Sequence, residues 1–250
     1  MSKNKPVSTT SNAVHFTLQG KGGVGKSLVS ALLSQYFLSI EGCPVKCIDT
    51  DPVNQTLVSY KALKAQHVKL MDDSKIDERN FDLLMERLLS EDGVFVVDNG
   101  ASSFVALSNY LVENNAIEML QDAGREVFVH CVIAGGQALI PTMDGFRALA
   151  EQPAIKNIVI WLNEFFGDIE YNGKAFNEMK AYLDNADKVR GIVRIAKRNQ
   201  DTFGKDVQVM ATSNLTFNEV LQGSDFTIMA KQRIKTVQRD IYDQLNNVGF

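Results

Sequence analysis

One short segment near the amino terminus constrains the fold of this chain more than any other feature. It runs from Gly20 to Ser27 with the spacing G-x-x-x-x-G-K-S, which lets a backbone loop wrap around a chain of phosphates. Val14–Leu18 ahead of it is strand-like, and apolar residues at helical spacing follow it, namely Val29, Leu32, Leu33, Tyr36, Phe37 and Ile40. A phosphate-binding loop requires this order of strand, turn and helix.

The residue types in the loop suit phosphate chemistry. Glycines let backbone N–H groups converge on phosphate oxygens, Lys26 neutralises the β and γ charges, and the Ser27 hydroxyl can ligate Mg²⁺. The residues that we predict to bind the nucleotide at this loop are Gly20, Lys21, Gly22, Gly23, Val24, Gly25, Lys26, Ser27 and Leu28.

Strand-like and helix-like segments alternate along the rest of the chain. The runs that predict strands are Val45–Ile48, His67–Met71, Val94–Val97, Val127–Ile133, Ile158–Leu162 and Val189–Ile195. Helical spacing marks a helix capped by Asp77, another through Phe146 and Leu149, and the region Thr216–Val248. This alternation predicts an α/β fold of the P-loop NTPase type, with a mostly parallel, twisted sheet and helices on both faces. We expect one domain over residues 13–250 behind a polar tail at residues 1–12.

Polar side chains follow several of the predicted strands. Asp49 and Asp51 come after one, Asp98 after the next apolar run, and Asn163 after a later one. An open α/β sheet places its ligand site at the carboxyl ends of its strands, so these residues and the loop outline a nucleotide site. Asp98 fits the Walker B role of holding Mg²⁺, and Asp49 and Asp51 can share metal contact and orientation of the attacking water. The other interpretation of each aspartate is a turn or helix-cap residue.

Composition limits the other functions. The net charge of −4 and pI of about 5.5 exclude a basic field over the whole molecule, so any contact with nucleic acid must be a local patch. Cys43, Cys47 and Cys131 lie next to or inside strand-like runs, which indicates small core residues in a reducing compartment. Without an apolar leader or a long apolar span, we expect a cytoplasmic protein and no strong membrane signal.

Lys21 makes the loop resemble one known family. It precedes Gly22 and Gly23 to give K-G-G-x-G-K-S, although a loop lysine by itself would be solvated and dispensable. The segment resembles the deviant Walker A loop of the ParA/MinD-type ATPases. That resemblance implies a nucleotide-sandwich homodimer in which Lys21 reaches the phosphates of the partner subunit, so that hydrolysis depends on dimerisation.

The resemblance extends past the loop and implies further roles. Ile48–Pro52 looks like the family's Walker A′ element, so Asp51 would position water and Asp49 would lie on the metal side. Asn163 is similar to the asparagine that binds adenine, and no N-K-x-D guanine signature follows a strand, which favours ATP over GTP. The implied catalytic residues are Lys21, Lys26 and Asp51, and the implied metal ligands are Ser27, Asp49 and Asp98. In two places the chain departs from the family pattern, because Val53 follows Asp51-Pro52 and Asn99–Ser103 replaces a segment that usually contains proline.

Blocks from Leu18 to Asn163 resemble more closely the TraL family of ATPase-like proteins of conjugative plasmids. The clearest are Leu18-Gln19-Gly20, Cys47–Asn54, Val97–Phe104, Gly135–Leu139 and Trp161–Asn163. This resemblance implies a role in plasmid transfer or maintenance, with a transfer or partition protein as partner.

Three alternatives concern what the ATPase acts on. Lys231, Arg233, Lys235 and Arg239 form an acid-free window, and another contains Lys188, Arg190, Arg194, Lys197 and Arg198. Either could contact DNA phosphates, and either could be a solvated helix face.

A metal or iron–sulfur carrier ATPase would need paired cysteines, whereas Cys43 and Cys47 are spaced C-x-x-x-C. A small-molecule kinase or ligase would need a second basic site and a lid.

Overall fold

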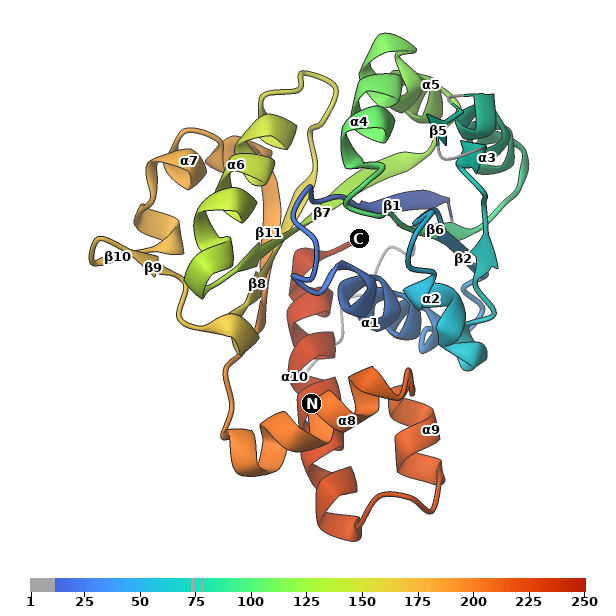
Figure 1. The fold of residues 1–250 in the computed structure, drawn as a ribbon. Helices are drawn as coiled ribbons and strands as arrows, with labels where there is room; N and C mark the ends of the chain where they lie inside the picture. The colour runs from blue at the N-terminus through green and yellow to red at the C-terminus, as the bar shows by residue number, and fades with distance from the viewer. Residues whose placement is uncertain (1–11, 73–74, 78) are drawn as a thin grey trace, which may run out of the picture.

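A seven-stranded sheet organises the computed structural model, which describes residues 12–72, 75–77 and 79–250. Its strand order is β11-β8-β7-β1-β6-β2-β3, and every pairing in it is parallel. The first strand, β1 (Ala13–Thr17), lies in the middle, between β6 (Val94–Asp98) and β7 (Glu126–Ala134). The remaining strands of this sheet are β2 (Val45–Asp49), β3 (Gln66–His67), β8 (Ile158–Asn163) and β11 (Val189–Ile195). The predicted α/β fold is therefore confirmed (Figure 1).

One predicted strand, His67–Met71, is wrong in its extent. Strand β3 ends at His67, and the Val68 N–H still donates to the Asp49 carbonyl at 2.9 Å before the chain leaves the sheet. After the strand, Leu70 is fully buried in the core, in the same cluster as Phe81 and Leu84 of α3 (Arg79–Ser90). Beyond it, β4 (Met71–Asp72) pairs with β5 (Lys75–Ile76) in an antiparallel ribbon.

Helices cover both faces of the sheet, as Figure 1 shows. One face carries α3 (Arg79–Ser90), α4 (Phe104–Glu113), α5 (Ala116–Asp122), α6 (Leu139–Ala150) and α7 (Lys180–Leu183). The other carries α1 (Lys26–Leu38), α8 (Lys205–Thr212), α9 (Phe217–Gln222) and α10 (Ile228–Val248), and α2 (Thr56–Ser59) packs beside α1. Short elements complete the described chain: η1 (Lys61–Leu63), η2 (Gly136–Ala138), η3 (Glu164–Phe166), η4 (Phe176–Glu178), η5 (Ala186–Lys188), the π-helical η6 (Gln200–Gly204), and the ribbon of β9 (Glu170–Tyr171) and β10 (Lys174–Ala175).

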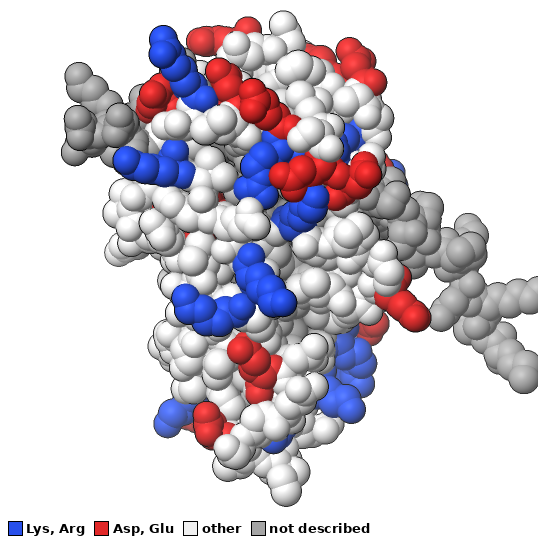
Figure 2. Space-filling view, turned by 90° about the vertical axis from the view of Figure 1, so that its right-hand side faces the viewer, with Lys and Arg blue, Asp and Glu red and all other residues white. Residues whose placement is uncertain are grey.

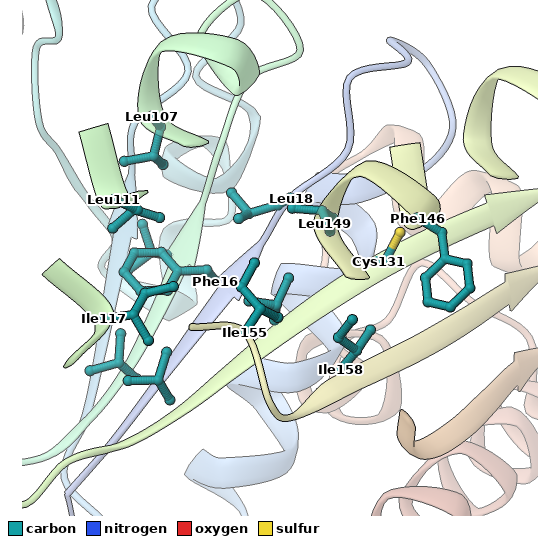
Figure 3. Close-up of a cluster of buried hydrophobic side chains, with 14 of the residues drawn as sticks. Phe16, Leu18, Leu107, Leu111, Ile117, Cys131, Phe146, Leu149, Ile155 and Ile158 are labelled. Atoms are coloured by element: carbon teal, nitrogen blue, oxygen red, sulfur yellow. The ribbon is translucent and has the colours of Figure 1, made fainter. Parts of the chain in front are cut away.

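Side chains that alternate along each strand build two apolar cores, one on each face of the sheet. Phe95 and Val97 of β6 pack with α3 to α6, whereas Val94 and Val96 pack with α1 and α10. Successive side chains of a strand point to opposite faces, so an apolar run fills both layers. Figure 3 shows the first layer, with Phe16 of β1 among side chains from the neighbouring strands and helices.

The predicted helical region Thr216–Val248 is two helices. Thr216 and Glu219 form a capping box at the start of α9, and the Thr227 side chain accepts a hydrogen bond from the Ala230 N–H at the start of α10. The chain between them, from Gly223 to Thr227, is not helical. Each helix thus has its own capping residue, which satisfies N–H groups that lack helical partners.

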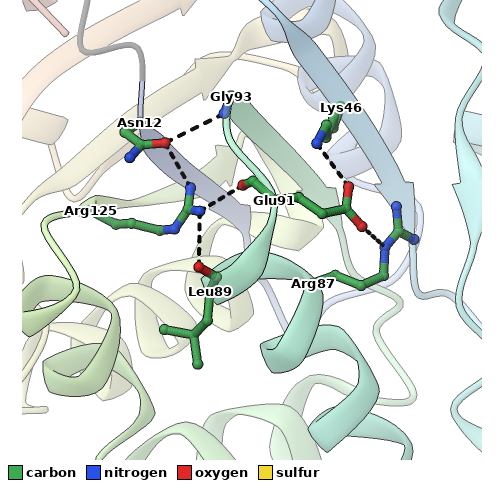
Figure 4. Close-up of polar contacts among 7 residues, drawn as sticks. All are labelled: Asn12, Lys46, Arg87, Leu89, Glu91, Gly93 and Arg125. Carbon is green, nitrogen blue, oxygen red and sulfur yellow. Dashed lines mark hydrogen bonds and ion pairs between the residues drawn. The ribbon is translucent and has the colours of Figure 1, made fainter.

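A buried arginine holds the amino-terminal edge of the sheet together (Figure 4). The Arg125 side chain is only 4% exposed, and its guanidinium donates to Asn12 Oδ1 at 3.1 Å and to the carbonyls of Glu91 and Leu89 at 2.6 and 3.5 Å. The Gly93 N–H also donates to Asn12 Oδ1. We refer to these residues as the Arg125 cluster. Asn12 is therefore fixed rather than part of the predicted tail, and residues 1–11 of that tail lie outside the described chain.

Candidate functional site

The predicted loop connects β1 to α1 at the carboxyl edge of the sheet. Gly23 and Gly25 have φ angles of 74° and 99°, which favour glycine. Gly25 occupies the N-cap of α1, and none of the described side chains caps this helix end. The free N–H groups and the positive end of the helix dipole therefore face the loop, as an anion site requires.

The two lysines of the loop have different environments. Lys26 is 7% exposed, and its Nζ donates to the Lys21 carbonyl at 3.0 Å. Burial lowers the pKa of Lys26, while the charges of Asp98 and Asp51 act in the opposite direction. The Lys21 side chain is exposed to solvent at the loop surface. Lys26 thus lies inside the site, and Lys21 is accessible to a second molecule.

Asp98 lies beside the loop at the end of β6 and is 1% exposed. Ser30 Oγ lies 2.9 Å from both Asp98 Oδ1 and Thr17 Oγ1, and the Ser27 side chain lies close enough to lower the pKa of Asp98. Asp98 Oδ2 is buried, with no hydrogen-bond partner among the described residues. The pKa of Asp98 is raised to about 7, chiefly by burial; the Ser27 side chain lowers this pKa, and the charge of Asp49 raises it. A buried carboxylate oxygen without a partner beside a hydroxyl suits Mg²⁺ or its bound water.

Asp49 and Asp51 order the segment after β2. Asp49 is fully buried, and its two carboxylate oxygens accept from the N–H groups of Asp51 and Val58 at 3.0 and 3.2 Å. Asp51 Oδ1 accepts from the N–H groups of Val53 and Asn54 at 2.8 and 3.0 Å. These bonds give both aspartates a turn-forming role, and Asp49 has less free bonding capacity for a metal than Asp98.

Asn163 contacts the loop itself. Its Nδ2 donates to the Val24 carbonyl at 2.9 Å, its Oδ1 accepts from the Phe165 N–H at 3.2 Å, and the residue is 2% exposed. A Cβ at Gly25 would lie 2.8 Å from Asn163 Nδ2, so the loop also needs glycine there for space. The amide ties β8 to the phosphate loop, and its contact with adenine stays a prediction.

A pocket that sequence reasoning missed adjoins the loop. Its volume is about 400 Å³, and its lining includes Leu28, the residue that follows Ser27. Its apolar walls include Phe165, Ile195, Phe203 and Met210, and polar side chains at its lining include Lys197, Gln200, Asp201 and Gln208. The sequence signal was the segment that follows the strand Val189–Ile195, because that segment leaves the same edge of the sheet as Asn163.

In the predicted basic cluster from Lys188 to Arg198, the lysines and arginines form ion pairs or hydrogen bonds within the protein. Arg194 pairs with Glu164, Lys197 with Asp168, and Arg198 with Asp240. Lys188 donates to the carbonyls of Ala150 and Gln152 behind α6, and Arg190 donates to that of Gly249. On the face shown in Figure 2, acidic and basic side chains are interspersed.

The carboxyl-terminal cluster keeps fewer accessible cations than the sequence suggested. Arg233 Nε lies 2.5 Å from Asp206 Oδ2, and Lys231 Nζ donates to the Gly223 carbonyl. Lys235 and Arg239 on α10 are exposed, although Arg239 also lies 3.6 Å from Asp240. Only a short stripe therefore faces solvent.

The cysteines lie where the sequence predicted. Cys47 and Cys131 are buried, Cys43 is half-buried, and all three are free thiols. Burial raises the pKa of each, most strongly for Cys131, to about 12. Thiols of this kind are unreactive core residues.

Comparisons with known proteins agree with this geometry. The family described as the CobQ/CobB/MinD/ParA nucleotide binding domain matches residues 16–239. The chain belongs to this family. Two Escherichia coli proteins named TraL are 46% and 45% identical to it, covering 94% and 93% of this chain and 98% and 97% of their own lengths.

Solved structures of the family share its fold. A ParA family ATPase from Chlorobium tepidum TLS superposes with a TM-score of 0.55 at 14% identity, covering 91% of this chain and 98% of its own. The MinD cell division protein of Aquifex aeolicus superposes with a TM-score of 0.52 at 14% identity, covering 91% and 95%. The family's nucleotide-binding fold is thus common to all three. In the described part of the chain, no helix has the length and apolarity to cross a membrane.

Proposed function

We propose that this protein is a cytoplasmic, Mg²⁺-dependent ATPase that works as a nucleotide-gated homodimer in plasmid conjugative transfer or partition. The observation that carries the proposal is the buried Oδ2 of Asp98, beside Ser27 and Lys26 of the phosphate loop, which has no hydrogen-bond partner among the described residues. The two TraL relatives, at 46% and 45% identity over nearly the whole chain, support the plasmid setting.

The residues divide the binding of ATP among them. Backbone N–H groups of the loop and the α1 terminus would hold the phosphates, and Lys26 Nζ would exchange the Lys21 carbonyl for phosphate oxygens. Ser27 and Asp98 would hold Mg²⁺, which neutralises charge on the β- and γ-phosphates. The apolar pocket beside Leu28 has room for the base, with Asn163 fixing the adjoining loop.

Hydrolysis needs an oriented water and extra positive charge on the γ-phosphate. Asp51 would orient the water that attacks the γ-phosphorus, after which the bond to the β–γ bridging oxygen breaks and ADP and phosphate are released. The exposed Lys21 of a partner subunit would stabilise the charge that develops. This division assigns binding to Lys26 and dimer-dependent turnover to Lys21.

The test compares three lysine variants. Lys26→Ala should abolish ATP binding, because the buried charge inside the loop is lost. Lys21→Ala should bind ATP within about threefold of wild type but lose dimerisation and about 10³-fold in turnover, the scale of a lost finger-type cation. Lys156→Ala, at an exposed position before β8, is the control and should behave as wild type.

Three measurements read these outcomes: binding of a fluorescent ATP analogue, light scattering with ATP, and release of inorganic phosphate. A Lys21→Ala protein that still dimerises with ATP would overturn the role in trans. Appearance of the γ-phosphate on a small acceptor instead of as free phosphate would favour a kinase. Failure of Lys26→Ala to weaken binding would overturn the site.

DNA remains a proposed partner through the exposed Lys235 and Arg239 of α10, while Lys231 donates to the Gly223 carbonyl and Arg233 is held by Asp206. Retention of DNA with ATP should weaken in the variants Lys235→Glu and Arg239→Glu, and it should fall as salt rises. Equal weak retention by wild type and variants would exclude this contact.

A further inference from the structure

Gln19 is a fully buried polar residue immediately before the phosphate loop. Its Nε2 lies 3.0 Å from the Val132 carbonyl of β7 and 3.0 Å from the Thr142 carbonyl of α6. A carboxamide nitrogen carries two N–H donors, so each carbonyl takes one. The orientation of the amide is therefore fixed by two different elements.

The fixed nitrogen leaves the amide oxygen facing the loop. Gln19 Oε1 lies 3.4 Å from the Lys21 nitrogen, at the long end of hydrogen-bond distances. On the other side, the Lys21 carbonyl accepts from Lys26 Nζ at 3.0 Å. The backbone of Lys21 is thus held between Gln19 and Lys26, while its side chain extends into solvent.

A glycine in the middle of α6 makes room for this amide. A Cβ at Gly145 would lie 2.1 Å from Gln19 Oε1, a distance that no real contact allows. Glycine inside a helix costs about 1 kcal/mol relative to alanine. The helix contains a destabilising residue at the one place where the Gln19 amide needs space.

We propose that Gln19 is a positioning residue for Lys21, through which α6 and β7 set the direction of the exposed lysine. The task of Lys21 in this inference rests on the proposed function. When Lys26 Nζ turns to a bound phosphate, the Lys21 carbonyl loses its hydrogen bond from Lys26. Within the described chain, the bond from the Lys21 N–H to Gln19 Oε1 is then the side-chain contact that the Lys21 backbone keeps.

Two variants disturb the amide from opposite sides. Gln19→Glu is nearly isosteric but puts a second oxygen against the carbonyls of Val132 and Thr142, whereas Gly145→Ala keeps Gln19 and removes its space. Asp144→Ala, at the exposed neighbouring position of α6, is the control. Thermal unfolding first establishes that each protein folds, and Gly145→Ala decides the matter if the buried glutamate prevents folding.

The expected result is a split between binding and turnover. Gly145→Ala should bind ATP within about threefold of wild type while ATP-dependent dimerisation falls and kcat falls about 10-fold to 100-fold, the scale of a misplaced catalytic group. Made in the Lys21→Ala protein, the same change should cause no further loss. A full additional loss there, or wild-type turnover in folded Gly145→Ala, would overturn the proposal.

Hydrogen exchange of the loop separates this inference from the proposed function. The amide of Lys21 should exchange faster in Gly145→Ala than in wild type or Asp144→Ala, whatever Lys21 does in turnover. If Lys21→Ala retains dimerisation and turnover, the proposed function fails, and exchange alone then decides whether Gln19 holds the loop. Unchanged exchange at Lys21 would overturn the positioning role.

Discussion

Buried polar groups have different hydrogen bonding at the amino-terminal and the carboxyl-terminal ends of the strands, which we call the amino edge and the carboxyl edge of the sheet. At the amino edge, the Arg125 guanidinium donates to three oxygens and lies 5.4 Å from the ring centre of Phe95. At the carboxyl edge, Asp98 Oδ2 is buried and, within the described part of the chain, has no hydrogen-bond partner, while Lys26 Nζ donates there to a single carbonyl. The amino edge has its buried charge satisfied within the chain, and the carboxyl edge leaves bonding capacity for a ligand.

This difference separates stability from function. A buried polar group with all its partners rigidifies the structure around it, whereas one without partners costs free energy until something binds. The Arg125 cluster should therefore contribute to unfolding free energy and not to nucleotide binding. Asp98 should do the reverse, and the following predictions test that contrast.

The largest expected effect on stability is at Arg125. Arg125→Met removes the donors of Asn12 Oδ1 and of the Leu89 and Glu91 carbonyls, so we expect about 2–4 kcal/mol less unfolding free energy in urea. ATP binding below the melting range should be unchanged. Arg147→Met, at an arginine whose side chain is 58% exposed, should change stability by less than about 0.5 kcal/mol. Equal losses in the two variants would remove the contrast between the edges.

Asp98→Asn should change stability in the opposite direction. Its carboxyl has a pKa of about 7 in the folded protein against an ordinary value of 3.8, so the folded state binds the proton more tightly. This group therefore makes wild type less stable as pH rises from about 4 to about 7. Above that range, Asp98→Asn should exceed wild type by up to a few kcal/mol in metal-free buffer.

The stability gain of Asp98→Asn over wild type should vanish near pH 4, and thermal unfolding between about pH 4 and pH 7 measures this gain. In the same variant, Mg²⁺-dependent ATP hydrolysis should be lost. In wild type, Mg²⁺ binding should strengthen as pH rises through about 7, because protons compete for the carboxylate. A pH-independent difference in melting temperature would show that Asp98 does not carry this effect.

The smallest effect is expected at the ion pair of Lys46 with Glu91, which flanks the Arg125 cluster in Figure 4. Its side chains are 33% and 35% exposed, and water and salt screen such pairs. Lys46→Gln should lower unfolding free energy by less than about 1 kcal/mol, and by less at high salt. A loss as large as that of Arg125→Met would mean that exposure does not rank the contacts of this edge.

The sheet and the main site followed from local sequence. Val94–Asp98 is an apolar run that ends in a carboxylate. Such a run predicts a buried strand with its last side chain at the carboxyl end of the sheet. The loop from Gly20 to Ser27 was equally predictable, because its glycines and Lys26 have no simpler common use. The region Thr216–Val248 was predicted as one helical region, and the capping residues Thr216 and Thr227 are the sequence signal for the two helices that it forms.

Contacts between distant segments did not follow from the sequence. Asn163 bonds to Val24, and Arg198 pairs with Asp240, so the partner of each is set only by the folded chain. The apolar pocket beside Leu28 is lined by α1, η3, the segment from Arg194 to Met210, α9 and α10 for the same reason. Spacing along the chain identifies which residues can do chemistry, but folding decides which of them are free to do it.

The central place of β1 has a consequence for synthesis on the ribosome. Its neighbours β6 and β7 end at Asp98 and Ala134 of the 250 residues, so the first strand gains one neighbour only after more than a third of the chain has been made and the other only after more than half. Asp98 arrives with the first of these neighbours, and Asn163 later still. A nascent chain therefore carries its phosphate loop for most of translation without the surroundings that would let it retain a nucleotide.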